Sequence, residues 1–340
     1  MKKIEVSLLE LTTRVVGVFT RLGVPQADAE LVADSLMDAE ICGVESHGLM
    51  RVAAYAQRLR SGLVEAAPKI QMIQNGSVLQ VDGGNGLGQV VACRTMEACI
   101  RVARKQGSCF AAVSHSNHFG TAGYYTRMAA QERMIGFACT SAGPTMAPFG
   151  GCQNLLGTDP FSVAFPAEGN PPFTLDIAVS AAAKGKIRVY AKEGRKLPDS
   201  WAIDRFGNAT TDPEEAISGC LLPMAGHKGY GMAIAIEALS SLLSGAKLSC
   251  EGESVFDAGQ PAQVGHFMGV LDISHFISAS AFEQRAGGWF DRIRSAPRQP
   301  GVERILIPGE LEEERRARAE GSLKVSERTY RELCALSEES

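Results

Sequence analysis

The sequence predicts an α/β protein in which a mixed β-sheet forms the core and a helical segment precedes it. Residues 8–62 carry apolar side chains at helical spacing, with glycine or proline at the expected helix boundaries. From about Ser77 the pattern changes to short apolar runs separated by Gly, Pro and Asn clusters, which is typical of strands. A long apolar helix is predicted over residues 230–243, where Gly245 stops it.

Three helices are predicted before the sheet. The first ends at Gly23, and the second opens at Pro25 and stops at Gly43. The third is predicted to start near Ser46, which would cap it, and to run to Gly62. The apolar stripe of the first helix consists of Leu8, Leu9, Leu11, Val15, Val16, Val18 and Phe19.

The strands follow in the next part of the chain, beginning with residues 78–81 and a helix over residues 89–105. Further strands are predicted at residues 109–113, 135–139, 161–165, 173–177 and 270–273. A charged helix over residues 312–318 is expected to return and cover the N-terminal helices. We therefore predict an N-terminal helical domain of residues 1–75, joined by the tail 311–340, and an α/β domain of residues 76–310.

The composition is that of an ordinary folded protein. Hydrophobic residues make up 45% of the 340 residues and charged residues 21%, which excludes a disordered or fibrous chain. The net charge of −4 argues against a general binder of nucleic-acid backbones. Glu5 and Glu10 interrupt any signal-peptide core, and no apolar run approaches the ~18 residues that cross a bilayer. We expect neither a nucleic-acid nor a membrane partner.

The nine cysteines are scattered and include no CxxC pair. This usage predicts reduced, mostly buried thiols in a cytoplasmic protein. No pair has the spacing of zinc ligands, so no metal site is predicted.

Two glycine-rich segments do not fit the known phosphate loops. Residues 83–88 lie between a strand and a helix, but a GxGxxG motif starting at Gly84 requires Gly or Ala where Gln89 stands. We interpret this segment as a turn before a buried helix. Residues 226–229 lack the GK[ST] of a Walker loop.

The segment 45–51 carries the first candidate site. If Ser46 caps the third helix, His47 lies in its first turn, and Arg51 lies four residues on, on the same face. An imidazole and a guanidinium that converge can hold a carboxylate and move a proton beside it. The alternative, favoured on this pattern alone, is that His47 only borders the helix and Arg51 pairs with a surface acid.

Polar residues at the ends of strands give further candidates. His115 and His118 follow a strand, and one of them is expected to face a catalytic or cofactor site, since HxxH in a loop is a weak metal signal. Asp176 ends an apolar strand, where it either partners a histidine or caps the next turn. Lys228 lies between glycines and either reaches a phosphate or carboxylate or belongs to a surface turn.

Longer stretches carry a resemblance to a known family. They occur together and in register from residue 45 to residue 310, and they are ESHGLMRV, SNHFGTAGYY, APFGG, GTDPFSVAFP, LDIAVSAAAKGKI, LPDSWAIDRFGNATTDP, GHKGYGMAIAIEALSSLLSGA and IPGE. On these stretches the chain resembles the malate/L-lactate dehydrogenase type 2 family, which includes ureidoglycolate and sulfolactate dehydrogenases, 2,3-diketogulonate reductases and piperideine-2-carboxylate reductases. The resemblance implies an NAD(P)-dependent oxidoreductase with a non-Rossmann nucleotide-binding fold, and a homodimer whose active sites form between subunits.

The resemblance also implies roles for individual residues. His47 is expected to donate and accept the proton, oriented by Ser46 and Asp176. Arg51 is expected to clamp the substrate carboxylate, with Ser141 and Thr158 also on the substrate. His118 resembles a residue between nicotinamide and substrate that serves as the base in some members. NAD is the expected cofactor, with NADP left open, and its contacts are expected at His118, Phe119, Gly120, Thr121, Asp176, Ile177, Ala178, Ser180, His227, Lys228, Pro308, Gly309 and Glu310.

Two positions depart from the family pattern, because Ser141 and Asp159 stand where many relatives have Asn. They leave the identity of the substrate open. The main hypothesis is interconversion of a small 2-hydroxy acid and its 2-keto acid, since histidine offers a base with a suitable pKa while the cofactor carries the hydride. The alternatives are NADPH-dependent reduction of a cyclic imine acid, and a catalytically silent protein that kept the fold.

Overall fold

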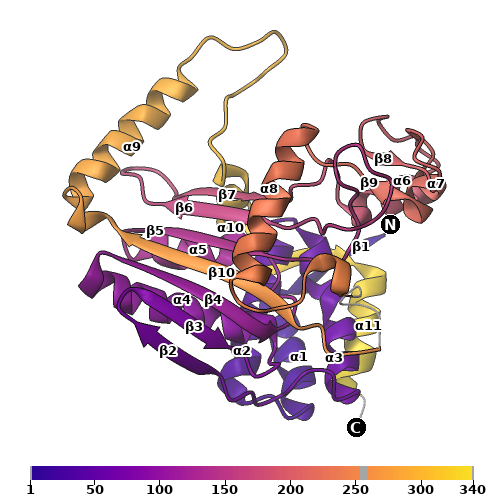
Figure 1. Ribbon diagram of the computed structural model, residues 1–340, viewed down its shortest axis with the longest axis horizontal. Coiled ribbons are helices and arrows are strands. Elements are labelled where there is room, and N and C mark those ends of the chain that lie inside the picture. Colours follow the sequence, from indigo (N-terminus) through magenta and orange to yellow (C-terminus); the bar gives the residue numbers. More distant parts are fainter. Residues whose placement is uncertain (1, 253–258, 339–340) are drawn as a thin grey trace.

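The computed structural model describes residues 2–252 and 259–338 of the chain. Seven strands form a mixed sheet in the order β2-β3-β4-β10-β5-β6-β7 (Figure 1). The pair β3–β4 is parallel, and the other neighbouring pairs are antiparallel. These strands are β2 (Gln71–Asn75), β3 (Val78–Asp82), β4 (Ser108–Ser116), β5 (Met134–Thr140), β6 (Phe161–Phe165), β7 (Phe173–Ile177) and β10 (Val264–Asp272). This arrangement confirms the predicted α/β class with a mixed sheet, and its strand order differs from that of a Rossmann fold.

Two small sheets accompany the main one. β1 (Lys3–Ser7) pairs with β11 (Ser322–Ser326), and β8 (Ala202–Ile203) pairs with β9 (Cys220–Leu221). The helices are α1 (Leu8–Arg21), α2 (Gln26–Ile41), α3 (Val52–Arg60), α4 (Gly88–Gln106), α5 (Ala122–Gln131), α6 (Lys184–Glu193), α7 (Pro213–Ser218), α8 (His227–Glu237), α9 (Ala279–Arg294), α10 (Glu310–Arg318) and α11 (Glu327–Glu338).

Helices cover both faces of the main sheet. On the central strand β10, Met268 and Val270 pack with α4 and α5 in one apolar cluster. Phe267, whose side chain points the other way, packs with Ala233 and Ile236 of α8 in another. Figure 1 shows α8 crossing this second face, and α9 projecting away from the sheet at the upper left. The strand ends that carry the candidate site residues therefore lie between helical layers.

The two ends of the chain lie together. β11 pairs with β1, and α11 packs against α1, so the C-terminal segment lies beside the N-terminal helices at the lower right of Figure 1. Val325 and Leu333 are buried in the same apolar cluster as the N-terminal helices, and Leu87 and Val90 near the start of α4 join them. The division at residue 75 stays a prediction.

Several elements differ from the predicted ones. The strand predicted at residues 270–273 is the end of β10, which begins at Val264. The helix predicted over residues 230–243 is α8 followed by a π-helical turn, Ala238–Leu242. β1 and β11 were not predicted because each depends on a partner at the far end of the chain. The polar α9 was not predicted either, since Gly287 and Gly288 interrupt its apolar pattern.

The nine cysteines carry free thiols, and six of them are buried. None of the helices in residues 2–252 and 259–338 combines the length and the apolar composition that a membrane span needs.

Candidate active site

The segment 45–51 does not form the start of a helix, contrary to the prediction. It consists of two short 3₁₀ turns, Glu45–His47 and Leu49–Arg51, and α3 begins only at Val52. The cause is Glu40 on α2, which is buried and whose Oε2 accepts the Leu49 amide at 3.0 Å. A side chain on Gly48 would collide with this carboxylate. Gly48 therefore lets the chain pass over Glu40, and the hydrogen bond to Leu49 interrupts the helix.

Three predicted catalytic and substrate residues nevertheless converge in these turns. The Ser46 hydroxyl lies 2.9 Å from His47 Nδ1, and Arg51 Nε donates to the Ser46 carbonyl oxygen at 2.5 Å. Burial lowers the pKa of His47 to about 4, and the positive charge of Arg51 acts in the same direction. At neutral pH a neutral imidazole therefore lies beside a guanidinium, as the motif suggested.

His118 joins this group from the loop after β4. Its ring stacks on that of His47, with centroids 5.4 Å apart and planes inclined by 26°. The hydroxyl of Tyr55, on α3, lies 2.5 Å from His118 Nδ1. Burial holds the pKa of His118 well below its usual range, and the positive charge of Arg51, like that of a protonated His47, acts in the same direction. Both imidazoles are neutral at pH 7.

The glycine-rich segment 83–88 supports the His118 loop rather than a phosphate. A Cβ on Gly88 would lie 2.5 Å from the His118 carbonyl oxygen, and closer still to that of Asn117. The Asn117 side-chain amide donates to the Gly86 carbonyl at 2.8 Å. The glycines thus allow two backbone segments to touch, and this contact fixes the position of His118.

His266 is a site-supporting residue that the sequence analysis missed. It is fully buried on β10, with Nδ1 2.7 Å from the Thr140 hydroxyl and Nε2 2.8 Å from the Ser116 hydroxyl. Its ring stacks on Phe119 at 4.6 Å. Tyr55 is likewise a site-supporting residue that the sequence analysis does not single out. For His266, the available signal was a histidine inside an apolar run. For Tyr55, it was the spacing of four residues from Arg51.

The segments that carry Ser141 and Thr158 meet at a buried carboxyl group. Asp159 is fully buried with a φ of +31°, and its Oδ1 accepts the Ala142 amide at 3.0 Å. Among the described residues, Asp159 Oδ2 has no hydrogen-bond partner. Burial raises the pKa of Asp159 well above its usual range, and the negative charge of Glu237 adds to the effect. Ser141 is buried, and the Thr158 carbonyl accepts the Val179 amide at 2.9 Å.

Asp176 lies at the end of β7, as expected, but its carboxylate accepts the Gly123 amide at 2.7 Å. In the described part of the single chain it makes no hydrogen bond to His47, whose hydroxyl partner is Ser46. Desolvation of the carboxyl group by the protein around it raises the pKa of Asp176 to about 6, although part of the residue is exposed at the surface of the chain. The structure shows the contact between Ser46 and His47, and the catalytic relay of Ser46, His47 and Asp176 stays a prediction.

The predicted cofactor residues lie on four segments. Phe119 and Gly120 are buried, and Thr121 precedes α5. Ile177 ends β7, Ala178 follows it, and the Ser180 hydroxyl donates to the Ala182 carbonyl at 2.9 Å. His227 and Lys228 are the exposed first residues of α8. The fourth segment is Pro308, Gly309 and Glu310, where the Pro308 carbonyl accepts the Thr174 amide of β7 at 3.0 Å.

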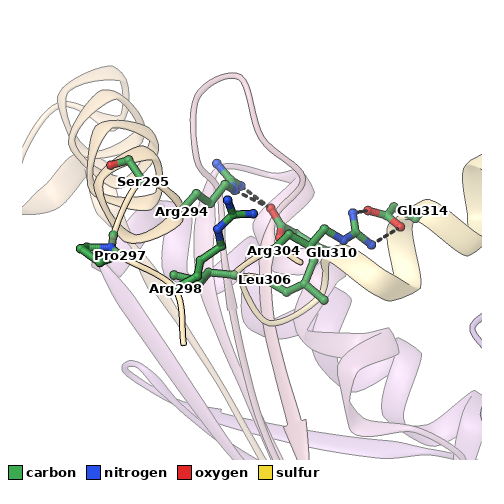
Figure 2. Close-up of a pocket in the computed structure, with 10 residues that line it drawn as sticks. Arg294, Ser295, Pro297, Arg298, Arg304, Leu306, Glu310 and Glu314 are labelled. Atoms are coloured by element: carbon green, nitrogen blue, oxygen red, sulfur yellow. Dashed lines mark hydrogen bonds and ion pairs between the residues drawn. The ribbon is translucent and has the colours of Figure 1, made fainter. Parts of the chain in front are cut away.

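A pocket of about 540 Å³ lies at this fourth segment, between the end of α9 and the start of α10. Figure 2 shows the residues that line it. Glu310 is clamped there, because its carboxylate accepts both Arg294 Nε at 2.8 Å and the Ile307 amide at 2.8 Å. Arg304 pairs with Glu314, and Arg298 donates to the Glu303 carbonyl. Of the predicted site residues, Glu310 lines this pocket and His47 does not, as far as the described residues show.

Comparison with known proteins identifies the family. The profile of the malate/L-lactate dehydrogenase family matches residues 6–334. The chain belongs to this family. It is 42% identical over 305 residues to malate dehydrogenase from Pyrococcus horikoshii, covering 87% of this chain and 84% of the relative. It is 36% identical over 321 residues to L-sulfolactate dehydrogenase from Methanocaldococcus jannaschii, covering 94% and 92%.

The chain is also similar to a solved structure of an enzyme that is named for a different type of substrate. The structure of Δ1-piperideine-2-carboxylate reductase from Pseudomonas syringae pv. tomato has a TM-score of 0.88 and 27% identity, covering 98% of this chain and 99% of that one. The predicted family is thus confirmed, and this family member is an oxidoreductase of the hydroxy acid dehydrogenase type.

Dehydrogenases of this kind imply a nicotinamide cofactor, and the residues of this family member fit one. His47, His118 and Arg51 offer proton transfer and anion binding, but none of the three accepts a hydride. The cofactor must therefore carry it. His227 and Lys228 open α8, where the positive end of the helix dipole and the Lys228 ammonium group favour a phosphate group. Within the described residues, no group of three His, Cys, Asp or Glu side chains is arranged to hold a metal ion.

Proposed function

We propose that the protein interconverts a small 2-hydroxy acid and its 2-keto acid, with NAD(P) as the hydride carrier and His47 as the group that moves the proton. The observation that supports this most directly is the convergence of Ser46, His47 and Arg51. The Ser46 hydroxyl forms a hydrogen bond with the His47 ring, and the Ser46 carbonyl oxygen accepts one from the Arg51 guanidinium. A carboxylate held by Arg51 would have its neighbouring hydroxyl group beside the imidazole.

Each residue has a defined task in the oxidation. Arg51 binds the substrate carboxylate, and neutral His47 accepts the hydroxyl proton, which its pKa of about 4 in the free protein permits at pH 7. Ser46 keeps the ring oriented through Nδ1, with Asp176 as the expected third member of the relay. A bound nicotinamide would supply the hydride chemistry, as acceptor in the oxidation and as donor in the reduction.

The reduction needs a protonated His47, and substrate binding itself supports this. Arg51 lowers the pKa of His47 in the free protein. A substrate carboxylate on Arg51 neutralises that charge, so the pKa of His47 rises in the complex. A larger fraction of the imidazole then carries a proton that it can deliver to the keto oxygen, although burial, the larger cause of the low pKa, still acts.

The test is a substrate panel with a matched pair of histidine variants. Pyruvate, oxaloacetate, sulfopyruvate, oxalurate and diketogulonate are offered with NADH and with NADPH, and nicotinamide absorbance is followed. We expect at least one keto acid to be reduced. We expect kcat of His47→Ala to fall by a factor of about 10²–10⁴, the usual contribution of general acid–base catalysis, while the variant still binds the nucleotide. His275→Ala, at an exposed histidine outside the site, is the control. Failure of the whole panel, or near-normal turnover by His47→Ala, would contradict the proposal.

A second candidate function is the NADPH-dependent reduction of a cyclic imine acid such as piperideine-2-carboxylate. The likeness to the Pseudomonas syringae reductase over nearly the whole chain favours it. The imine also requires a hydride and a proton, so His47 and Arg51 would have the same tasks. Turnover of piperideine-2-carboxylate with NADPH, together with no turnover of the keto acids, would select this function.

We further propose that NAD is the cofactor, with NADP as the alternative, and that the protein is a cytoplasmic homodimer with its site between subunits. The free thiols support a reducing compartment. Leu242 and Leu243, 67% and 60% exposed after α8, support an interface with a second copy. The ratio of kcat/KM for NADH and NADPH tests the cofactor preference.

A further inference from the structure

Two hydrogen-bond donors meet the same nitrogen of His118. The Gly120 backbone amide donates to Nδ1 at 3.4 Å, and the Tyr55 hydroxyl lies 2.5 Å from the same atom. A backbone amide can only donate, so Nδ1 must accept. An accepting Nδ1 leaves the Tyr55 hydroxyl only the role of donor in its contact with this atom.

The surroundings keep both partners in the required ionisation states. Tyr55 is buried, and burial raises its pKa to about 12, so it stays a phenol that can donate. The pKa of His118 is held well below its usual range by burial, so the ring stays neutral. A neutral imidazole carries one hydrogen, and with Nδ1 as acceptor that hydrogen is on Nε2.

The backbone around His118 is built to present these donors. Gly120 has a φ of +82°, a left-handed conformation that places its amide beside the ring two residues earlier. Tyr55 lies on the first turn of α3, because the helix begins at Val52 and not at Ser46. The position of the tyrosine hydroxyl therefore depends on the same interruption at Gly48 that brings His47 and Arg51 together.

We infer that Tyr55 is a positioning residue that fixes His118 as its Nε2–H tautomer, so that His118 donates a hydrogen bond to the reacting oxygen of the substrate and proton transfer falls to His47. The catalytic part of this inference rests on the proposed function. A neutral Nε2–H cannot accept a proton at that atom, and giving its proton away outright would leave an imidazolate. It can stabilise negative charge that develops on the oxygen.

The tautomer is tested directly on the ligand-free wild-type protein. The chain contains six histidines, and ¹⁵N-histidine labelling with two-bond ¹H–¹⁵N correlation spectra distinguishes pyridine-type from pyrrole-type nitrogens. The His118 signals are assigned from their loss in His118→Gln. We expect a pyridine-type Nδ1 and a pyrrole-type Nε2. The opposite pattern, or a protonated ring at pH 7, would overturn the inference. This experiment needs no substrate, so its result is independent of the proposed function.

The role of the hydroxyl is tested with two tyrosine variants. In Tyr55→Phe we expect the two His118 nitrogen signals to move toward each other. We also expect kcat to fall about tenfold, the rate equivalent of one neutral hydrogen bond, with KM changed by less than about threefold. Tyr330→Phe is the control, because the Tyr330 hydroxyl also donates a hydrogen bond, to Glu10 Oε1 at 2.6 Å, but makes it between α11 and α1 and not to the His118 loop. Unchanged His118 signals in Tyr55→Phe, or the same change in both variants, would refute the assignment. If Tyr55→Phe does not fold, the wild-type spectrum alone decides.

Discussion

At the scale of single residues, the segments with Ser141 and Thr158 are held by carboxyl groups that are shielded from water. Asp159 is one, and Glu237 is the other. The Ser249 hydroxyl contacts both the Ala142 carbonyl, at 2.5 Å, and the Glu237 carboxyl group. A hydroxyl has one hydrogen and cannot donate to both, so a protonated Glu237 satisfies the contacts best. Burial raises the pKa of Glu237, in agreement with that state.

Asp159→Asn tests whether Asp159 is also protonated. Its pKa is raised in the folded protein, so folding takes up a proton above the unfolded-state pKa, and this contribution to stability is lost as pH rises. The carboxamide of the variant does not titrate and takes up no such proton. We expect the free energy of unfolding of the variant to equal that of the wild type near pH 4. Above that pH, the variant should become more stable than the wild type by about 1.4 kcal/mol per pH unit, until the folded-state pKa of Asp159 is reached. Urea unfolding at a series of pH values measures the difference. A gap that is independent of pH would contradict a protonated Asp159.

Arg51→Gln tests the electrostatic coupling that the mechanism uses. Removing the guanidinium removes a positive charge that lowers the pKa of His47, so this pKa should rise above its value of about 4. KM for the keto acid should rise about 10–100-fold, because a charged hydrogen bond to the substrate carboxylate is lost. Histidine titration by NMR and steady-state kinetics measure the two effects. An unchanged His47 titration would show that burial alone sets its pKa.

At the scale of elements, the glycine-rich segment before α4 is expected to act on His118 through the backbone. In Gly88→Ala the new methyl group would collide with the Asn117 and His118 carbonyls, so the loop must shift. We expect a loss of about 1–3 kcal/mol in stability and a fall in kcat of about tenfold or more. Thermal unfolding and kinetics measure both.

The control for this variant is Gly288→Ala on α9. A Cβ at Gly288 would meet nothing within 4 Å, and alanine is the better helix former. We expect this variant to keep full activity and to be equally or slightly more stable. If Gly88→Ala behaves like Gly288→Ala, the contact between the glycine segment and the His118 loop does not position the site.

The local sequence pattern correctly predicted those elements that have a clear apolar run or a glycine or proline at their boundary. The strands at residues 161–165 and 173–177 coincide with β6 and β7, and Gly23 and Pro25 mark the boundary between α1 and α2. The predicted start of α3 near Ser46 was wrong, because the helix start depends on a hydrogen bond from Leu49 to Glu40, which belongs to another helix. The same holds at the site. The motif pointed to His47 and Arg51. Local spacing could mark Tyr55 and His266 as candidates, but it could not show their contacts, which join residues far apart in the chain.

At the scale of the whole molecule, the sheet gathers the site from distant segments. β4 and β5 both pair with β10, so the loop with His118 and the segment with Ser141 lie on either side of His266. The pairing of β1 with β11 ties the C-terminal segment to the N-terminal helices, and Lys3 of β1 forms an ion pair with Glu45 in the turn that carries His47. A folding unit of residues 1–75 alone would lack the buried contacts of Val325 and Leu333.

The proposed homodimer gives the last prediction. A pair of neighbouring leucines with most of their surface in water is costly for a single chain, and a second copy of the chain would cover it. Leu242→Asp/Leu243→Asp should therefore shift the mass measured by light scattering from two chains to one. Activity should fall with it if the site forms between subunits. Leu9→Asp, at a leucine of α1 that is 77% exposed, is the control and should keep the mass of two chains. A wild type with the mass of one chain, or a double variant that stays a dimer, would exclude this surface as the interface.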